Sequence, residues 1–310
     1  MKKLVNLLLV IALCGLSHFS SAQLLLNLPE SYIVDEPIGT DLALKTAKLP
    51  NGVKLQYAEQ GSFTGTPVIF LHGLSDSWHS FESVLSLLPN DIHAFAISQR
   101  GHGDSDRPLE GYSPKDFAGD VAEFIRLHYL GSVFIVGHSM GGIVAQQFAL
   151  DYPQLTKGIV LVSTAPSFKN NPGMPEFYEQ AMRLIEPMDK SFMNEFQKGT
   201  LAKPIDPAYY NLLVSEGIKV PVRVFKAALT GLMQADYTNQ LKNIKAPVLI
   251  MWGTKDNFCS QGDQEELVKE LRDARLFVYE RTGHALHWEE PARFVNDLVG
   301  FVTKSTRLKM

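Results

Sequence analysis

A serine inside a glycine-bounded turn is the clearest sign of chemistry in the sequence. The run from Val133 to Leu150, VFIVGHSMGGIVAQQFAL, passes from an apolar stretch typical of a strand through Gly137 to Gly141 and directly into a stretch typical of a helix. A turn this tight strains its central residue, and glycines two positions before and after remove side chains that would clash. We therefore expect the Ser139 hydroxyl to stand above a sheet edge as a nucleophile.

A serine hydroxyl is a weak nucleophile at neutral pH, so it needs a base and an acid that orients the base. In a strand-turn-helix architecture these partners follow later in the chain, each on a loop at the carboxyl end of a strand. Asp256 follows one predicted strand, and His284 follows the next one behind Gly283. The loop after Gly158–Val162 supplies no competing carboxylate. The pattern thus predicts Ser139 as nucleophile, Asp256 as acid and His284 as base.

An acyl-transfer site also needs two backbone N–H groups that stabilise the oxyanion of the tetrahedral intermediate. One should be the amide of Met140, next to the nucleophile, and the other an amide in the loop after an early strand. Val68–Leu71 reads as such a strand and runs into His72-Gly73-Leu74, so we assign the second donor to Leu74. We interpret His72 as a structural histidine that bonds the backbone of this loop.

The stretch RTGHALHWEEP holds two histidines three residues apart, and only the first directly follows a strand. His284 is therefore the predicted base. His287 falls on the side of the following helix and is interpreted as a structural residue, while the glutamates that precede Pro291 are expected near the positive end of that helix.

A metal site is the competing interpretation of the histidines. Apart from the last pair, the five candidates are spread over separate loops: His72, His102, His138, His284 and His287. No H-E-x-x-H motif and no clustered Cys/His spacing is present in the sequence. We expect no metal and no cofactor. Cys259, three residues after Asp256, is interpreted as a buried, unreactive cysteine.

The elements that must position these residues alternate between short β-branched apolar runs and longer amphipathic stretches, which is typical of a mostly parallel sheet with crossover helices. An Asn-Gly turn within LPNGVKLQY, near Leu44–Tyr57, predicts antiparallel strands at the start. The predicted strands are Val53–Ala58, Val68–Leu71, Ala94–Ser98, Val133–Val136, Gly158–Val162, Val248–Trp252 and Leu276–Tyr279. The predicted helices between them are Trp78–Leu87, Pro114–His128, Gly141–Leu150, Gln264–Leu271 and Pro291–Thr303.

One segment interrupts this alternation. Between about Ser167 and Gln240 no convincing strand occurs, and four helices separated by Pro- and Gly-bearing turns are predicted. They are Phe177–Ile185, Lys190–Gly199, Pro207–Glu216 and Pro221–Leu232. The segment is interpreted as a helical insertion placed on one edge of an α/β core.

The first residues have the layout of a secretory signal peptide: Lys2 and Lys3, an apolar run to Leu16, then a small-residue site before Gln23. We expect cleavage after residue 22 and export from a bacterial cytoplasm to the periplasm or the medium. Cleavage would remove two of the 29 Lys and Arg and none of the 33 Asp and Glu, leaving a formal charge of −6. Such a surface gives no reason to expect nucleic acid, or an anionic membrane after cleavage, as a partner. Only Cys259 would remain, so no intramolecular disulfide could form.

Five motifs together resemble the α/β-hydrolase fold family: HGLSDSW, SQRGHGDSDRP, VGHSMGG, WGTKD and TGHALHWEEP. The resemblance covers about Asn51 to Val302. It is greatest to the lidded branch that holds small-molecule esterases, lactonases, carbon–carbon bond hydrolases and cofactor-free haloperoxidase-like proteins. It implies an α/β-hydrolase core in two parts, residues 23–166 and 241–310, with a lid at 167–240. It also implies the same roles for Ser139, Asp256 and His284, with Leu74 and Met140 as oxyanion donors.

The expected function is cleavage of a small, neutral or partly apolar carboxylic ester or lactone through an acyl-enzyme. Aromatic and methionine side chains of the insertion, such as Phe196 and Met193, favour an apolar ceiling over the site. Two alternatives stay open. The same triad could act on a carbon–carbon bond or in haloperoxidase-like perhydrolysis, or the fold could serve as a ligand-binding receptor.

Overall fold

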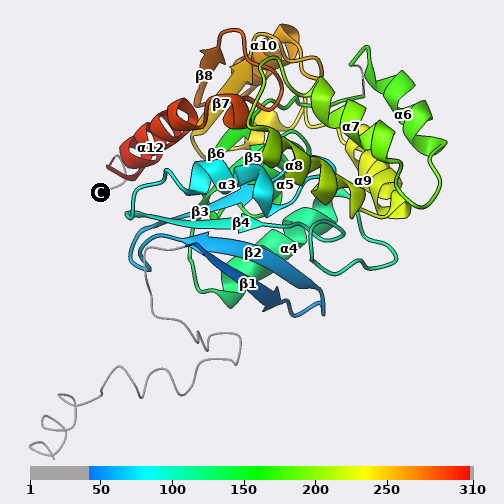
Figure 1. Cartoon of the computed structure of the whole chain (residues 1–310). Coiled ribbons are helices and arrows are strands. Elements are labelled where there is room, and N and C mark those ends of the chain that lie inside the picture. The colour runs from blue at the N-terminus through cyan, green and yellow to red at the C-terminus, as the bar shows by residue number, and fades with distance from the viewer. Residues whose placement is uncertain (1–41, 170, 308–310) are drawn as a thin grey trace, which may run out of the picture. The chain divides into compact units, whose positions relative to one another are not determined.

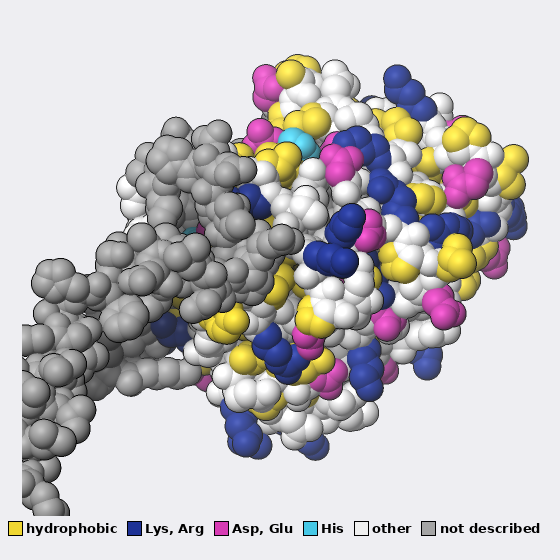
Figure 2. Space-filling view, turned by 90° about the horizontal axis from the view of Figure 1, so that it is seen from below, with side chains coloured by type: hydrophobic (Ala, Val, Ile, Leu, Met, Phe, Trp, Pro, Cys, Tyr) yellow, Lys and Arg dark blue, Asp and Glu magenta, His cyan; other side chains and the backbone are white. Residues whose placement is uncertain are grey.

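The computed structural model describes residues 42–169 and 171–307. The expected signal peptide, residues 1–22, lies outside the described residues. Among the helices of the described part, none combines the length and the apolar character that a bilayer span requires. Positively and negatively charged side chains are interspersed on the face displayed in Figure 2.

Eight strands of the described part form one sheet in the order β1-β2-β4-β3-β5-β6-β7-β8 (Figure 1). The first two pairings, β1 with β2 and β2 with β4, are antiparallel, and the remaining neighbours are parallel. The strands are β1 (Ala43–Lys48), β2 (Lys54–Gln60), β3 (Thr66–Leu71), β4 (Ile92–Ile97), β5 (Val133–His138), β6 (Thr156–Val162), β7 (Val248–Gly253) and β8 (Ala274–Tyr279). The mostly parallel sheet and the antiparallel start were both expected, and the Asn51-Gly52 turn joins β1 to β2 with Gly52 at a φ of +88°.

Burial along the strands explains why their residues suit these places. Every residue of β4, β5 and β7 is buried, as expected for strands covered on both faces. The edge strands β1 and β8 instead alternate between partly buried and exposed residues over most of their length. Of their exposed positions, Thr46, Lys48 and Arg275 are polar, whereas Leu44 and Phe277 are apolar.

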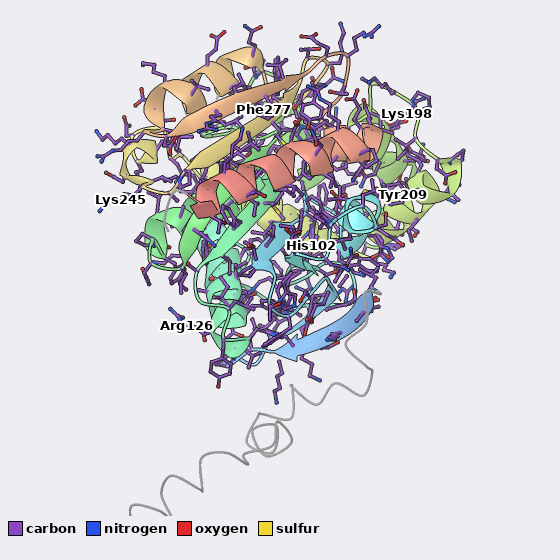
Figure 3. The ribbon with its side chains drawn as sticks, turned by 90° about the vertical axis from the view of Figure 1, so that its left-hand side faces the viewer. His102, Arg126, Lys198, Tyr209, Lys245 and Phe277 are labelled. Atoms are coloured by element: carbon purple, nitrogen blue, oxygen red, sulfur yellow. The ribbon has the colours of Figure 1, made fainter. Side chains whose placement is uncertain are left out.

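Helices cover both faces of the sheet, and the alternation of strand residues separates two cores. The helices are η2 (Trp78–Phe81), α3 (Glu82–Leu85), α4 (Pro114–Leu127), α5 (Met140–Asp151), α10 (Gln261–Glu270), α11 (Leu286–Glu289) and α12 (Pro291–Arg307). Ile69, Ile135 and Leu161 pack in one core with residues of α4 and α5. The neighbouring residues Phe70 and Val136 pack in the other core with residues of α3 and α12, and Figure 3 shows α12 lying across that face. Successive residues of a strand point to opposite faces of the sheet, so neighbours such as Ile69 and Phe70 belong to different cores.

Between β6 and β7 the described residues form the four helices predicted for the insertion and a short 3-10 turn that was not predicted. They are α6 (Met174–Met182), α7 (Lys190–Gly199), α8 (Pro207–Ile218), α9 (Val222–Gln234) and η3 (Leu241–Asn243). Figure 1 shows α6 to α9 grouped on one side of the sheet. Asp189 and Asp206 begin α7 and α8 by accepting hydrogen bonds from the backbone N–H groups of Phe192 and Tyr209.

The expectation of a single helix over Trp78–Leu87 is wrong. A 3-10 turn, η2, precedes the four-residue helix α3, and its last residue, Phe81, has a non-helical ψ of 9°. The Ser77 hydroxyl accepts a hydrogen bond from the His79 amide at 3.3 Å, which closes a tight first turn instead of an α-helical one.

Candidate active site

The turn that joins β5 to α5 carries Ser139 in a strained conformation, with φ 53° and ψ −115°. The Ser139 amide donates to the Val162 carbonyl at 2.9 Å, and the Ser139 carbonyl accepts from the Gly142 amide at 2.8 Å. These two hydrogen bonds keep the residue in its strained backbone conformation. A Cβ at Gly137 would overlap the carbonyl of Gly141, and one at Gly141 would overlap the carbonyl of Leu71. The glycines are therefore required here, as the sequence predicted.

A hydrogen bond joins the predicted acid and base. His284 Nδ1 lies 2.9 Å from Asp256 Oδ1 and 3.0 Å from Oδ2, and the two side chains are 5% and 0% exposed. Asp256 Oδ1 also accepts the backbone N–H groups of Phe258 at 2.8 Å and Cys259 at 3.0 Å. Since a carboxylate only accepts, Nδ1 carries the proton of this bond and Nε2 of the neutral ring is left as a base.

The loop that follows β8, residues 280–285, is named here the histidine loop, and it packs against the nucleophile turn. His138, next to Ser139, donates from Nε2 to the His284 carbonyl at 3.2 Å, and the two rings lie 4.9 Å apart. On its other side His284 contacts the ring of Phe258 at 4.8 Å. The fold thus brings the base loop, the nucleophile turn and the loop of the acid, residues 254–257 (the acid loop), to one edge of the sheet.

The two predicted oxyanion donors, one on a loop and one at the start of α5, also lie at this edge. The loop after β3, residues 72–76, is called the oxyanion loop and contains Leu74. Strands β3 and β5 are parallel neighbours with Leu71 opposite Gly137, so this loop and Met140 emerge side by side. Met140 is the first residue of α5, whose first N–H groups have no acceptor within the helix. Both residues are buried.

His72 is structural, as interpreted from the sequence. Its Nδ1 donates to the Gly73 carbonyl at 2.8 Å, and its Nε2 accepts the Gln99 amide at 3.0 Å. Burial holds the pKa of this ring well below its usual range, so it is neutral and braces the oxyanion loop.

The interpretations of His287 and Cys259 also agree with the structure. His287 is fully buried, its Nε2 lies 3.1 Å from Ser80 Oγ, and burial lowers its pKa to about 3. Cys259 is buried, and its S–H donates to the Ser163 carbonyl at 3.4 Å. Burial, reinforced by the nearby charge of Asp256, raises the pKa of this thiol well above its usual range. Cys259 is therefore a neutral, unreactive thiol.

Asp256, Cys259 and His284 each place one possible metal-ligand atom within 4.8 Å of the others. A cysteine binds metal as the thiolate, and the environment of Cys259 disfavours that form. His284 Nδ1 is already bonded to the Asp256 carboxylate, at 2.9 Å from Oδ1 and 3.0 Å from Oδ2. The group fits a hydrogen-bonded acid–base pair better than a metal site.

Sequence reasoning missed three contacts at the candidate site. Glu289 does not serve the first turn of α12 as expected; its Oε1 accepts the amides of Ala202 at 2.6 Å and Gly283 at 3.2 Å. Asp76 and Gln197, which are bonded to each other, also gave no local signal because 121 residues separate them.

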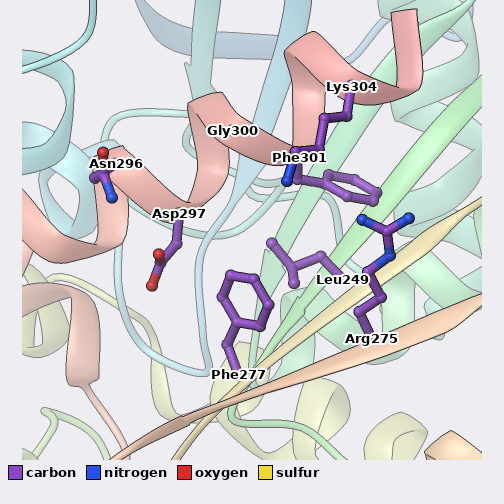
Figure 4. Close-up of a pocket in the computed structure, with 8 residues that line it drawn as sticks. All are labelled: Leu249, Arg275, Phe277, Asn296, Asp297, Gly300, Phe301 and Lys304. Carbon is purple, nitrogen blue, oxygen red and sulfur yellow. The ribbon is translucent and has the colours of Figure 1, made fainter. Parts of the chain in front are cut away.

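The pocket drawn in Figure 4 belongs to a different part of the molecule. It lies between β8 and α12, has a volume of about 270 Å³ and is lined in part by Arg275, Phe277 and Lys304. Its carboxylate, Asp297, accepts the Tyr279 hydroxyl at 2.7 Å. None of its lining residues belongs to the loops described above.

Residues 66–291 match the family model described as alpha/beta hydrolase fold. The chain therefore belongs to the alpha/beta hydrolase fold family, as its motifs indicated. Helices on both faces of a mostly parallel sheet and the strand-turn-helix at Ser139 agree with this assignment.

Relatives of the chain include several kinds of protein. It is 28% identical to a putative 2-succinyl-6-hydroxy-2,4-cyclohexadiene-1-carboxylate synthase of Bacillus subtilis, over 82% of this chain and 96% of that protein. It is 26% identical to lipase 3 of a Moraxella species, over 90% of each. The structure of an esterase from Exiguobacterium antarcticum superposes with a TM-score of 0.76 at 25% identity, covering 83% of this chain and 98% of that one. Lipase and esterase relatives support a hydrolase.

Proposed function

We propose that the protein is a serine hydrolase that cleaves a small, neutral or partly apolar carboxylic ester or lactone through an acyl-enzyme. The observation that carries the proposal is the bond of His284 Nδ1 to Asp256 beside the strained turn of Ser139. That bond orients the base, and the turn presents the hydroxyl. Lipase and esterase relatives support the same class of substrate.

In the proposed reaction the Ser139 oxygen attacks the substrate carbonyl carbon while His284 Nε2 takes the hydroxyl proton. The N–H groups of Leu74 and Met140 stabilise the negative oxygen of the tetrahedral intermediate. The intermediate collapses when the alkoxide leaves with the proton from His284, and the acyl group stays on Ser139. Water then attacks the acyl-enzyme by the same route, with its proton passing through His284, and releases the acid.

A chain of aromatic rings supports an apolar acyl or alcohol group in the substrate. Phe258 contacts His284, and Phe196 of α7 lies 5.8 Å from Phe258 between ring centroids. Phe196 in turn contacts Phe177 of α6 at 5.3 Å and Phe225 of α9 at 6.2 Å. The insertion therefore brings apolar side chains toward the base, where they would favour neutral substrates.

The test is hydrolysis of p-nitrophenyl esters of graded acyl length together with lactones, by the wild type and Ser139→Ala. We expect the variant to lose at least about 10³-fold in kcat, because no acyl-enzyme can form. A fluorophosphonate should label the wild type at one residue per chain and leave Ser139→Ala unlabelled. Ser215→Ala, which changes an exposed serine on α8, is the matched control and should behave as wild type. Labelling that persists in Ser139→Ala would contradict the proposal.

A further inference from the structure

Residues 197–203, the end of α7 and the start of its connection to α8, contact the oxyanion loop, the acid loop and the histidine loop, and we call them the clasp segment. Gln197 Nε2 donates to Asp76 Oδ1 in the oxyanion loop at 2.9 Å. Asn257 Nδ2 in the acid loop donates to the Gly199 carbonyl at 3.3 Å. A single stretch of the insertion is thus hydrogen-bonded to two separate loops at the carboxyl edge of the sheet.

The histidine loop is held in the same way. The Ala285 amide, next to the proposed base, donates to the Thr200 carbonyl at 3.0 Å. Glu289 accepts the amide of Ala202 and, from the other side, that of Gly283. A Cβ at Gly283 would overlap backbone atoms of Thr200 and Ala202, so the two chains are in close contact. The clasp segment therefore cannot shift without moving the loops it binds.

The contact between Gln197 and Asp76 is the one that reaches the oxyanion loop through side chains. Both residues are buried, at 1% and 2% exposed. Asp76 Oδ2 accepts the Ser80 hydroxyl at 3.4 Å and lies 3.9 Å from His138 Nδ1. Burial holds the pKa of His138 well below its usual range, so that ring is neutral and does not pair with the carboxylate.

Placing a carboxylate here is costly for folding. Burial raises the pKa of Asp76 to about 6, although the hydrogen bonds from Gln197 and Ser80 act in the opposite direction. A buried charge is retained only when hydrogen bonds compensate it, so the donor on Gln197 is a required partner. An apolar pair would be easier to bury at this place, which suggests that the bond has a use beyond packing.

We propose that the Gln197–Asp76 hydrogen bond positions the oxyanion loop. Because Asp76 is two residues from Leu74, this bond from the insertion sets the position of the Leu74 N–H group. The proposal rests on the serine-hydrolase function proposed above. Asp76 and Gln197 are positioning residues, because they act through the backbone of the loop and not on the substrate. Misplacing one oxyanion donor costs about 10² to 10³ in kcat.

The test exchanges donor and acceptor. Gln197→Glu places two carboxylates against each other, and we expect kcat to fall about 100-fold with KM changed less than about threefold. Asp76→Asn keeps an acceptor for Gln197 and should stay within about tenfold of wild-type kcat, since an amide oxygen still accepts. In Asp76→Asn/Gln197→Glu the donor and acceptor are reversed, and kcat should recover at least about tenfold from the Gln197→Glu value.

Lys198→Gln is the matched control, because it makes the same change of charge at the next residue, which is exposed on α7 (Figure 3). It should keep wild-type kcat. Thermal midpoints show which variants are folded at the assay temperature. If Gln197→Glu does not fold, Gln197→Met removes the donor at similar volume and should show the same loss of kcat.

The proposal is overturned if the Gln197 variants keep more than about one third of wild-type kcat, or if the double variant is no better than Gln197→Glu. If kcat falls only in variants whose thermal midpoint also falls, and the double variant does not recover kcat, the bond has a structural role alone. These outcomes are separate from failure of the proposed function, which would appear as a wild type that hydrolyses no ester or lactone, or as hydrolysis or fluorophosphonate labelling that persists in Ser139→Ala.

Discussion

At the scale of single residues, the two histidines of the RTGHALHWEEP stretch have different environments although they are three positions apart. His284 is bonded to Asp256 and lies beside the nucleophile turn. His287 is fully buried against Ser80 and the ring of Phe81, which lies 4.9 Å away. The difference follows from the short helix α11, which begins between them and turns His287 away from the strand end.

Replacing each histidine with glutamine tests this division. His284→Gln should lower kcat by about 10³-fold or more, because no group can take the Ser139 proton. His287→Gln should lower the free energy of unfolding by about 1–3 kcal/mol, since a buried polar contact is disturbed, and should keep most of the turnover. Ester hydrolysis and urea denaturation of both variants measure the two effects. Equal losses of turnover would refute the division.

Sequence reasoning found the residues whose signal is local and missed those whose signal is not. Ser139 stands in a glycine-bounded turn, and Asp256 and His284 each follow a strand, so spacing along the chain is sufficient. Asp76 and Gln197 meet only through the packing of α7 on the oxyanion loop. No pattern within a few residues encodes that contact, and an isolated aspartate after a strand resembles an ordinary turn residue.

At the scale of elements, the nucleophile turn shows how sequence and packing combine. A glycine at 141 lets the first turn of α5 approach the end of β3, where a Cβ would overlap the Leu71 carbonyl and lie 2.8 Å from the His72 carbonyl. The same close approach brings the oxyanion loop to the helix that carries Met140. The turn therefore depends on β3, which lies beside β5 in the sheet but 62 residues earlier in the chain.

Two glycine-to-alanine changes separate this packing requirement from helix propensity. Gly141→Ala should lower the free energy of unfolding by about 1–3 kcal/mol or more, because the methyl group has no space. Gly119→Ala, within α4 where no atom lies within 4 Å of the added Cβ, should raise it by about 0.5–1 kcal/mol through helix propensity. Urea denaturation gives both values. Similar effects of the two changes would contradict the close packing at Gly141.

Element prediction from the sequence succeeded where periodicity was strong. The seven predicted strands and the four helices of the insertion were found, with boundaries that differ by at most three residues. The stretch Trp78–Leu87 was predicted as one helix because its apolar spacing is helical, yet the Ser77 side chain closes a 3-10 turn first. A local side-chain hydrogen bond competes with helix formation, and the spacing of apolar residues along the sequence does not show which of the two wins.

At the scale of the whole molecule, the described part buries several neutral histidines. Burial lowers the pKa of His102 and of His128 to about 4 and that of His287 to about 3, and it holds the pKa of His72 and His138 well below the usual range. These rings take up protons in the unfolded chain near pH 6.5 but not in the folded one. Their contribution to stability is complete above about pH 6.5 and is lost as the pH falls toward the folded pKa values.

Asp76 acts in the opposite direction. Its pKa is raised to about 6 in the folded protein, so the folded state binds a proton before the unfolded state does as the pH falls. Between pH 7.5 and pH 5 this one carboxyl returns about 1 kcal/mol, whereas a histidine with a folded pKa of about 4 loses about 2 kcal/mol. Because several histidines oppose one carboxyl, the free energy of unfolding should fall steeply between pH 7 and pH 5.

His128 allows this prediction to be tested away from the candidate site. It lies after α4, with its ring 4.3 Å from Phe124 and 5.3 Å from Tyr57. In His128→Phe the aromatic contacts are largely kept but no proton can bind, so the loss of stability between pH 7.5 and pH 5 should be about 2 kcal/mol smaller than in the wild type. Urea denaturation at the two pH values measures this difference, and the packing cost of the larger ring cancels because it is the same at both. If wild type and variant lose the same stability, His128 is already protonated in the folded protein at pH 5, and the acid sensitivity must come from other groups.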